Sequence, residues 1–219
     1  MIRFIIITFI YITSIYGSIL DEAIAEHKNE NIKNAITLYK QSARAGNDEA
    51  NFKLGTIYYK GEGVRRNFDI AMKYFQKAAA YGHIKSKYNT AVIYSQKRYS
   101  KHNYIKAYNI FLELALEDDP ASQNKVGLFL TYGLGVDKDY KEAVKWFEKS
   151  YFKGDNLEAS CNLALMFASG KGVFPNFGRA YEISQEGYKK SIPICVKVNK
   201  EFNLHKYQKD KGFKYGFYK

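Results

Sequence analysis

The sequence repeats itself with a period of about 36 residues, and this period limits the possible folds more than any other feature. The clearest repeated column holds Asn or Asp, with successive separations of 36, 36, 36 and 37 residues: Asn31, Asn67, Asn103, Asp139 and Asn176. These residue types favour helix N-caps, because the side-chain oxygen accepts a hydrogen bond from an amide of the first turn. Four residues after each of them stands an alanine. A period of this length is typical of folds that repeat one small helical unit.

The same period marks where each of these helices is expected to end. The residues at this position are Gly46, Gly82, Asp118, Gly154 and Ser191. Glycine adopts the left-handed backbone conformation that stops a helix, and Asp tolerates it. Ser191 departs from the pattern, but Pro193 follows it closely and can begin a new helix.

A second helix in each unit follows these stops. Its apolar residues lie at i, i+4 and i+8, as in Ala50, Leu54 and Tyr58, which form one stripe of an α-helix. Three units then carry a connection with paired glycines, for which we expect positive φ angles: Gly61 and Gly63, Gly133 and Gly135, and Gly170 and Gly172. The remaining unit has residues 97–100 here, without glycine, so its loop should be more mobile or folded differently.

These residues resemble a known family. The run Leu54-Gly55-x-x-Tyr58-x-x-Gly61-x-Gly63-Val64, followed by Ala71, Tyr74-Phe75, Ala78-Ala79 and Gly82, is similar to the Sel-one-like repeat (SLR) family of the tetratricopeptide superfamily. The resemblance covers residues 19–191 and is weaker between Ser86 and Asp118. It implies an all-α fold, a right-handed α-solenoid of stacked antiparallel helix pairs with about four to five repeats plus a C-terminal capping helix. In that family the concave surface binds protein segments.

The two ends of the chain are expected to differ from the repeats. Residues 1–17 place one positive charge before an apolar run, as a secretory signal peptide does, although an uncleaved membrane anchor is the alternative. Residues 18–209 form the expected solenoid, with a short first helix at 21–28. The closing helix from Pro193 to Lys209 should turn Ile194, Val198 and Phe202 inward. Residues 210–219 are a basic, aromatic tail that should fray.

The charge and the leader together indicate where the protein works and what it meets. The net charge of +12 is compatible with nucleic acid, acidic lipid or an acidic protein. Export argues against nucleic acid, so we expect a protein or peptide partner, with an acidic one as a candidate. The expected location is periplasmic or secreted, at a bacterial envelope, with no membrane span after cleavage of the signal.

Cysteine and histidine give no sign of a metal site. Cys161 and Cys195 match no metal motif and either form one disulfide or remain buried thiols, and the sequence slightly favours the thiols. The four histidines occur singly, without the spacing of ligands, and are expected to face solvent: His27, His83, His102 and His205. We therefore expect neither a metal nor a cofactor.

The motifs that suggest catalysis are incomplete. Gly170-Lys171-Gly172 resembles a phosphate loop but has neither a preceding strand nor a following Ser or Thr. Cysteine-rich relatives in the family have been described as penicillin-binding or β-lactamase proteins, and Ser122-x-x-Lys125 fits the first motif of such enzymes. The companion motifs are missing, and Ser122 falls in the column of small packing residues. No catalytic residue is expected, and a weak β-lactamase or an envelope structural protein remain the alternatives.

One polar column is the best candidate for binding. Lys53, Asn89, Lys125 and Asn162 recur with separations of 36, 36 and 37 beside the apolar stripe. All four donate hydrogen bonds, so they could hold a carboxylate or a peptide backbone. The alternative is that they are ordinary solvated helix positions. The sequence thus favours an exported scaffold that binds a protein or peptide through a concave groove.

Overall fold

The computed structural model describes residues 19–96 and 101–208, which are helical and contain no strand. The chain divides into two compact units, Met1–Gln96 and Lys97–Lys219. The leader at 1–17, the loop at 97–100 and the tail at 210–219 lie outside the described residues. The all-α fold with adjacent helices packed as pairs is confirmed.

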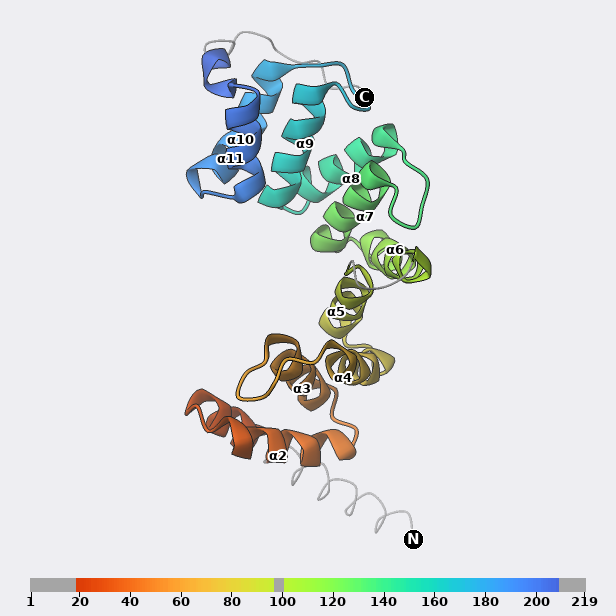
Figure 1. Ribbon diagram of the computed structural model, residues 1–219, viewed down its shortest axis with the longest axis vertical. Helices are drawn as coiled ribbons and strands as arrows, with labels where there is room; N and C mark the ends of the chain where they lie inside the picture. Colours follow the sequence, from red (N-terminus) through yellow and green to blue (C-terminus); the bar gives the residue numbers. More distant parts are fainter. Residues whose placement is uncertain (1–18, 97–100, 209–219) are drawn as a thin grey trace. The chain divides into compact units, whose positions relative to one another are not determined.

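The first unit contains helical residues 19–28 and four further helices (Figure 1). These are α2 (Ile32–Arg44), α3 (Asp48–Lys60), α4 (Phe68–Ala80) and α5 (Ile84–Tyr94). The α2 helix packs against α3, α3 against α4, and α4 against α5. This arrangement follows from the sequence, because a single helix pair cannot bury its apolar face alone.

The second unit continues the pattern and ends in two shorter elements. Its helices are α6 (Lys101–Leu116), α7 (Pro120–Tyr132), α8 (Tyr140–Phe152), α9 (Leu157–Ser169), α10 (Phe177–Lys189), α11 (Pro193–Glu201) and the 3-10 helix η1 (Leu204–Tyr207). Successive helices again pack together, and α11 contacts both α9 and α10. The last helix therefore covers the end of the preceding pair.

Three of the predicted N-caps are confirmed. The side chain of Asn67 accepts from the amides of two first-turn residues, and those of Asp139 and Asn176 each accept from one. Asn31 precedes α2 but makes no side-chain cap bond. The prediction for Asn103 is wrong, because this residue lies inside α6, which begins at Lys101. Its unit lacks the two-glycine connection that precedes the cap elsewhere.

The α3, α5, α7 and α9 helices have a second row of caps, which the sequence reasoning missed. Asn47, His83, Asp119 and Asn156 each accept a hydrogen bond from a first-turn amide. Their spacing of 36, 36 and 37 residues repeats that of the first row. This regular spacing marks the second row of caps in the sequence as clearly as the first.

The predicted helix stops are confirmed at four positions. Positive φ angles occur at Gly46, Gly82, Asp118 and Ser191, and at all six glycines of the paired connections. The prediction for Gly154 is wrong, since Asp155 takes the left-handed conformation instead, with φ of 50°. Gly154 has another role: a side chain there would overlap the ring of Pro120. The glycine therefore permits a close approach between chain segments.

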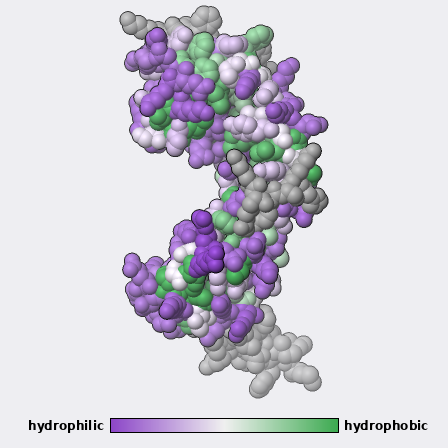
Figure 2. All heavy atoms as spheres, viewed as in Figure 1, coloured by the Kyte–Doolittle hydropathy of each residue, from purple (hydrophilic) through white to green (hydrophobic). Residues whose placement is uncertain are grey.

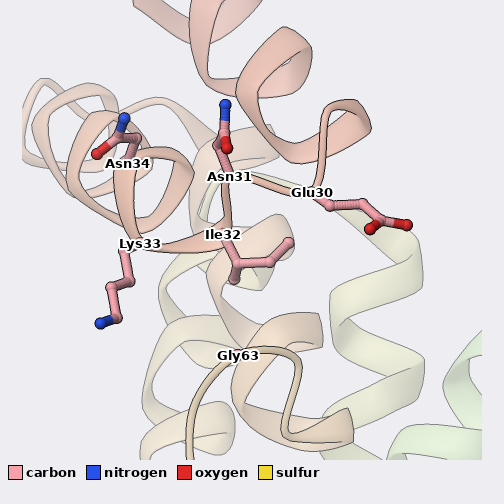
Figure 3. Close-up of a pocket in the computed structure, with 6 residues that line it drawn as sticks. All are labelled: Glu30, Asn31, Ile32, Lys33, Asn34 and Gly63. Carbon is pink, nitrogen blue, oxygen red and sulfur yellow. The ribbon is translucent and has the colours of Figure 1, made fainter.

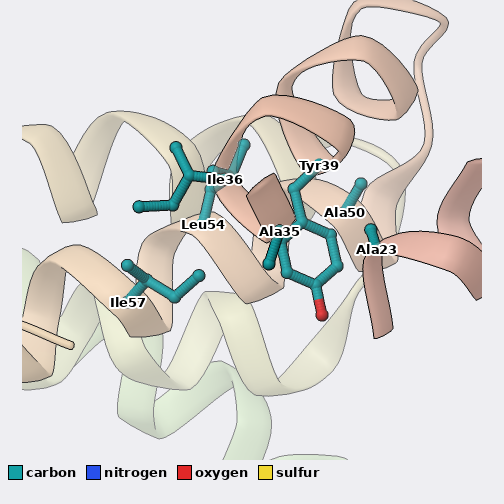
Figure 4. Close-up of a cluster of buried hydrophobic side chains, with 7 residues drawn as sticks. All are labelled: Ala23, Ala35, Ile36, Tyr39, Ala50, Leu54 and Ile57. Carbon is teal, nitrogen blue, oxygen red and sulfur yellow. The ribbon is translucent and has the colours of Figure 1, made fainter. Parts of the chain in front are cut away.

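One buried cluster of the first unit combines alanines and aliphatic residues with an aromatic ring. Its buried residues are Ala23, Ala35, Ile36, Tyr39, Ala50, Leu54 and Ile57. In Figure 4 the Tyr39 ring lies between Ala35 and Ala23. Alanines let the helices approach closely, and the ring fills the space that remains.

A glycine that faces an aromatic ring joins the helices of two equivalent pairs. A Cβ atom at Gly55 would lie 2.5 Å from the Phe75 ring, and one at Gly127 would lie 2.6 Å from the Phe147 ring. Both phenylalanines are almost completely buried. The repeat thus places the same contact between α3 and α4 as between α7 and α8.

The closing helix differs from its prediction. It ends at Glu201, because Asn203 adopts a left-handed conformation before η1 begins. Its buried face consists of Cys195, Val198 and Asn199, whereas Ile194 and Phe202 are only half-buried. The inward positions are therefore spaced i, i+3 and i+4, the usual core face of a short helix.

No helix within residues 19–96 and 101–208 is long and apolar enough to cross a membrane.

Candidate partner-binding surface

A pocket of about 310 Å³ lies in the first unit between helical residues 19–28 and α3. Its lining combines three lysines, one acid, apolar groups and hydroxyl groups: Ile24, His27, Lys28, Tyr39, Phe52, Lys53, Thr56, Lys60 and Glu62. Lys53, Thr56 and Lys60 are placed together because they are spaced i, i+3 and i+7 on α3. The pocket therefore contains one member of the predicted binding column, Lys53.

Lys53 is held loosely within this pocket. Its Nζ lies 3.1 Å from Glu49 Oε1, one turn earlier on the same helix, and 5.9 Å from the centre of the Phe52 ring. The side chains of Lys53 and Glu49 are 34% and 38% exposed. Partly exposed pairs of this kind contribute about 0–1 kcal/mol, so an incoming carboxylate can replace Glu49 at little cost.

Glu62 makes a second set of polar contacts in the pocket. Its carboxylate lies 3.0 Å from Lys60 Nζ and 3.2 Å from His27 Nε2, and His27 Nδ1 lies 3.3 Å from the Tyr39 hydroxyl. Burial, reinforced by the charges of Glu49 and Glu62, raises the pKa of Tyr39 to about 12. Tyr39 is therefore neutral at physiological pH and can donate to His27.

The prediction that the histidines face solvent is wrong for two of them. His27 takes part in the contacts just described, and His83 caps α5 by accepting from the Ser86 amide. His83 also stacks on Phe52 at 4.6 Å between ring centres and lies 3.3 Å from Glu49. His205 is exposed, as predicted, and the side chain of His102 lies outside the described residues. Single histidines gave no sequence sign of these contacts, because their partners come from other helices.

The rest of the predicted column divides into accessible and buried members. Asn89 in α5 and Lys125 in α7 are half-buried, and Lys125 forms no ion pair with a residue of the described ranges. Asn162 is only 7% exposed, and its Nδ2 donates to Asn124 Oδ1 at 2.9 Å. Asn162 therefore connects two helices of the second unit and is not free to hold a partner.

The accessible face of α7 offers a cation and an exposed aromatic ring. Lys125, Leu128 and Tyr132 are spaced i, i+3 and i+7 and so share one face of the helix. Tyr132 is 57% exposed. A large, rigid side chain at such a position is a common anchor in protein interfaces.

The Ser-x-x-Lys motif is not arranged for catalysis. Ser122 is completely buried, and its Oγ has no hydrogen-bond partner among the described residues, Lys125 included. A substrate cannot reach this hydroxyl without unfolding α7. No group of residues suited to a metal ion occurs in the described ranges.

The two cysteines form a disulfide between α9 and α11, with 4.7 Å between the Cα atoms of Cys161 and Cys195. The preference for free thiols is therefore wrong. A side chain at Gly187 in α10 would lie 2.5 Å from one sulfur and 2.9 Å from the other. The equivalent position carries Ser42, Ala78, Leu114 or Ser150 in the other repeats. The replacement of these side chains by glycine at position 187 was therefore the signal in the sequence that two sulfurs pack there.

A further pocket at the start of α2 lacks converging side chains. It is lined by Glu30, Asn31, Ile32, Lys33, Asn34 and Gly63. Figure 3 shows the polar side chains pointing in different directions, while Ile32 points toward the loop that carries Gly63. A Cβ atom at Gly63 would lie 2.7 Å from Ile32, so the glycine lets the loop pack closely on the start of α2.

The face drawn in Figure 2 is mostly polar. Hydrophilic residues predominate on this face, and hydrophobic ones form small separate areas. The exposed large apolar side chains include Tyr81, Leu116, Tyr132, Phe152 and Phe174. Single exposed apolar residues among charges suit recognition of a partner by a few anchors.

Consecutive helix pairs, repeated caps and glycine connections define a helical-repeat protein of the class that binds partners on a side of its stacked helices. The model of the Sel1 repeat matches residues 28–47, 48–83, 120–155 and 157–190, more than half of the chain. The protein therefore belongs to the Sel1-repeat family, as the resemblance implied. Sel1 repeats generally mediate protein binding.

Similar proteins come from bacteria and eukaryotes. The chain is 30% identical to human "Protein sel-1 homolog 2" over 79% of this chain and 26% of that protein. It is 32% identical to the "ERAD-associated E3 ubiquitin-protein ligase component HRD3B" of Arabidopsis thaliana over 48% of this chain and 17% of that protein. It thus spans about a quarter or less of these two relatives.

Solved structures show the same fold. The protective antigen c5321 of uropathogenic Escherichia coli, which displays an SLR fold, aligns with a TM-score of 0.73 and 26% identity over 86% of this chain and 40% of that one. A Sel1 repeat protein from Oxalobacter formigenes aligns with a TM-score of 0.65 and 26% identity over 80% and 72% of the two chains.

Proposed function

We propose that this protein is an exported scaffold that binds acidic segments of other proteins, on the accessible face of α3 in the first unit and on that of α7 in the second. The observation that supports this most is the pocket beside α3, whose lining includes three lysines together with Phe52 and Thr56. Lysines spaced along one face can pair with the carboxylates of an extended segment, while the ring of Phe52 provides an apolar contact.

In the proposed complex, Lys53 exchanges its ion-pair partner on the same helix for a carboxylate of the bound segment. A carboxylate of the bound segment would take the place of Glu49, and Glu49 would keep its contact with His83. Lys60 would similarly share Glu62 with His27. Glu49 and Glu62 each have a second basic neighbour, so each carboxylate keeps a partner when its lysine turns to the bound segment.

The second unit supports the proposal independently. Lys125 has no ion pair within the described ranges, and Tyr132 exposes an aromatic ring two turns later on α7. A cation followed by an aromatic anchor suits the same type of segment that the lysines of α3 suit. Asn89 remains part of this proposal as a half-buried donor on α5.

Export is supported by the chemistry of the disulfide. A bond between Cys161 and Cys195 persists in oxidising compartments such as the bacterial periplasm, and it is rare in the cytosol. The apolar leader predicted at residues 1–17 agrees with that location.

Site-specific crosslinking tests the proposed surface. A photoreactive residue replaces Lys53 or Lys125, and matched controls carry it at Lys73 on α4 or Lys141 on α8, both exposed lysines. We expect one covalent adduct of defined mass from cell envelopes at Lys53 and Lys125 only, and a weaker adduct as salt rises. Equal adducts at the control positions would contradict the proposal.

Charge reversal tests whether the segment is acidic. Lys53→Glu and Lys125→Glu should each reduce capture of the partner found by crosslinking, by roughly tenfold if a charged hydrogen bond is lost. Lys141→Glu makes the same charge change elsewhere and should have a small effect. Capture unchanged in both variants would show that the lysines are only solvated positions.

A further inference from the structure

A separate pocket of about 320 Å³ lies in the first unit where α2, α3 and α4 meet. Its lining residues are Lys40, Ala43, Arg44, Asn51, Tyr74 and Lys77. Three of these are cations, and none is an acid. The pocket shares no lining residue with the one beside Lys53, so it requires an explanation of its own.

The three cations have no counter-charge in the folded unit. Lys40, Arg44 and Lys77 form no ion pair within residues 19–96 and 101–208. Lys40 and Arg44 are four residues apart on α2, a helix that contains no acidic residue. Like charges at this spacing repel each other, and an anion bound between them would remove the repulsion.

Tyr74 adds a neutral donor between the charges. Its ring stacks on Tyr58, with 5.9 Å between ring centres, and Lys77 Nζ lies 5.9 Å from the Tyr74 ring. Burial raises the pKa of Tyr74, while the charges of Lys40 and Arg44, which line the same pocket, act in the opposite direction. The hydroxyl is therefore protonated at neutral pH and able to donate.

Asn51 provides a buried acceptor. It is 2% exposed, and its Nδ2 donates to the backbone oxygen of Asn47 at 2.8 Å. Its Oδ1 is buried and has no hydrogen-bond partner among the described residues. A buried acceptor normally has a partner, so a ligand that also donates a hydrogen bond would complete this pocket.

We propose that this pocket binds a phosphate group that retains a proton. Arg44 would hold two phosphate oxygens with its planar guanidinium, Lys40 and Lys77 would supply charge, and Tyr74 would donate to a third oxygen. The protonated oxygen would donate to Asn51. Sulfate has the same tetrahedral shape and the charge of the phosphate dianion but carries no proton at neutral pH, so it would leave Asn51 without a partner.

The first experiment compares the two anions on the full chain. Isothermal titration with inorganic phosphate and with sulfate, at constant ionic strength and pH 7, should show saturable binding of phosphate at one site and weaker binding of sulfate. Equal affinity for both anions would overturn the proposal, as would failure of both inorganic phosphate and the lipid phosphate tested below to bind.

Matched variants on one helix locate the site. Arg44→Gln should weaken phosphate binding by roughly tenfold or more, because it removes a charge-assisted hydrogen bond. Lys33→Gln removes one charge from an exposed position of the same helix outside this pocket and should change affinity by less than about twofold. Equal effects would show a general response to charge and contradict the proposal. Arg44→Lys should fall between wild type and Arg44→Gln, since it keeps the charge but not the two-pronged contact.

The source of the phosphate is distinguished by a second arm. Vesicles of phosphatidylcholine with and without phosphatidic acid are sedimented with wild type and with Arg44→Gln. Binding that needs both phosphatidic acid and Arg44 would identify a lipid headgroup, whereas binding of inorganic phosphate alone would identify a free phosphate. Each result supports the pocket, and failure of both probes would overturn it. Crosslinking at Lys53 is unaffected by either outcome.

Discussion

The pair α3–α4 in the first unit and the pair α7–α8 in the second are built alike at their contact and differently around it. In both, a glycine of the first helix faces a buried phenylalanine of the second: Gly55 with Phe75, and Gly127 with Phe147. Around α3, the polar groups are partly exposed and charged, as in the pair of Lys53 with Glu49. Around α7, they are buried amides, as in the bond of Asn162 with Asn124.

The difference teaches that the repeat determines packing, while single residues determine what each surface does. Small residues and rings must match wherever two helices meet, so the period preserves them. A lysine at a repeat position can be replaced by an asparagine without disturbing the packing, and the side chain then turns to a different partner. Function should therefore be sought where equivalent positions carry different residues.

Truncating the two equivalent rings should have the largest effect. Phe75→Ala and Phe147→Ala should each lower the free energy of unfolding by about 3–5 kcal/mol, because each leaves a cavity against a glycine that cannot fill it. Urea unfolding followed by circular dichroism measures both losses. Fluorescence of Trp146, the sole tryptophan of the chain, follows the second unit separately.

An exposed ring provides the control for this pair. Phe152 at the end of α8 is 51% exposed, and Phe152→Ala should cost less than about 1 kcal/mol. A loss below 1 kcal/mol at either Phe75 or Phe147 would show that the two contacts are not equivalent.

The disulfide distinguishes the second unit from the first, and a reductant can remove it. Reduction should lower the stability of the second unit by about 4 kcal/mol, since the bond joins residues 34 apart in sequence. The urea midpoint of Trp146 fluorescence should fall when reductant is added. The double variant Cys161→Ala with Cys195→Ala should show the lower midpoint with or without reductant, and a response to reductant in that variant would assign the effect elsewhere.

The sequence predicted the fold more fully than the binding surface, for a physical reason. Caps such as Asn67 and glycines such as Gly61 act on neighbours in the chain, so their spacing alone reveals them. The contacts of His27 with Glu62 and of Asn162 with Asn124 join residues 35 and 38 positions apart, and no local pattern marks such pairs. Gly154 was misread for a related reason, because it makes room for Pro120 from another helix.

Two asparagines of the predicted binding column test whether its buried and accessible members have different roles. Asn162→Ala should cost about 1–3 kcal/mol, because Asn124 would lose the partner of a buried amide oxygen. Asn89→Ala, at the equivalent half-buried position, should cost less than about 0.5 kcal/mol. Thermal or urea unfolding of the two variants measures the difference. Equal losses would mean that Asn89 is also a structural residue and would remove it from the proposed binding surface.

The smallest expected effect concerns the aromatic column and appears only at high pH. The position that carries Phe75 and Phe147 in later repeats carries Tyr39 in the first repeat, where burial and the charges of Glu49 and Glu62 raise the pKa of Tyr39 to about 12. An unfolded tyrosine titrates near pH 10, so the folded form holds its proton more tightly than the unfolded form. The stability that this contributes is complete below pH 10 and is lost as the pH rises from 10 to 12.

Tyr39→Phe gives the first repeat the phenylalanine of the later repeats and removes this dependence of stability on pH. Between pH 8 and pH 11, wild type should lose on the order of 1 kcal/mol more stability than Tyr39→Phe, because only wild type has the shifted hydroxyl. The comparison cancels the titration of the lysines, which both proteins share. Urea unfolding of both proteins across this range measures the difference, and parallel curves would show that the Tyr39 hydroxyl titrates alike in the folded and unfolded states.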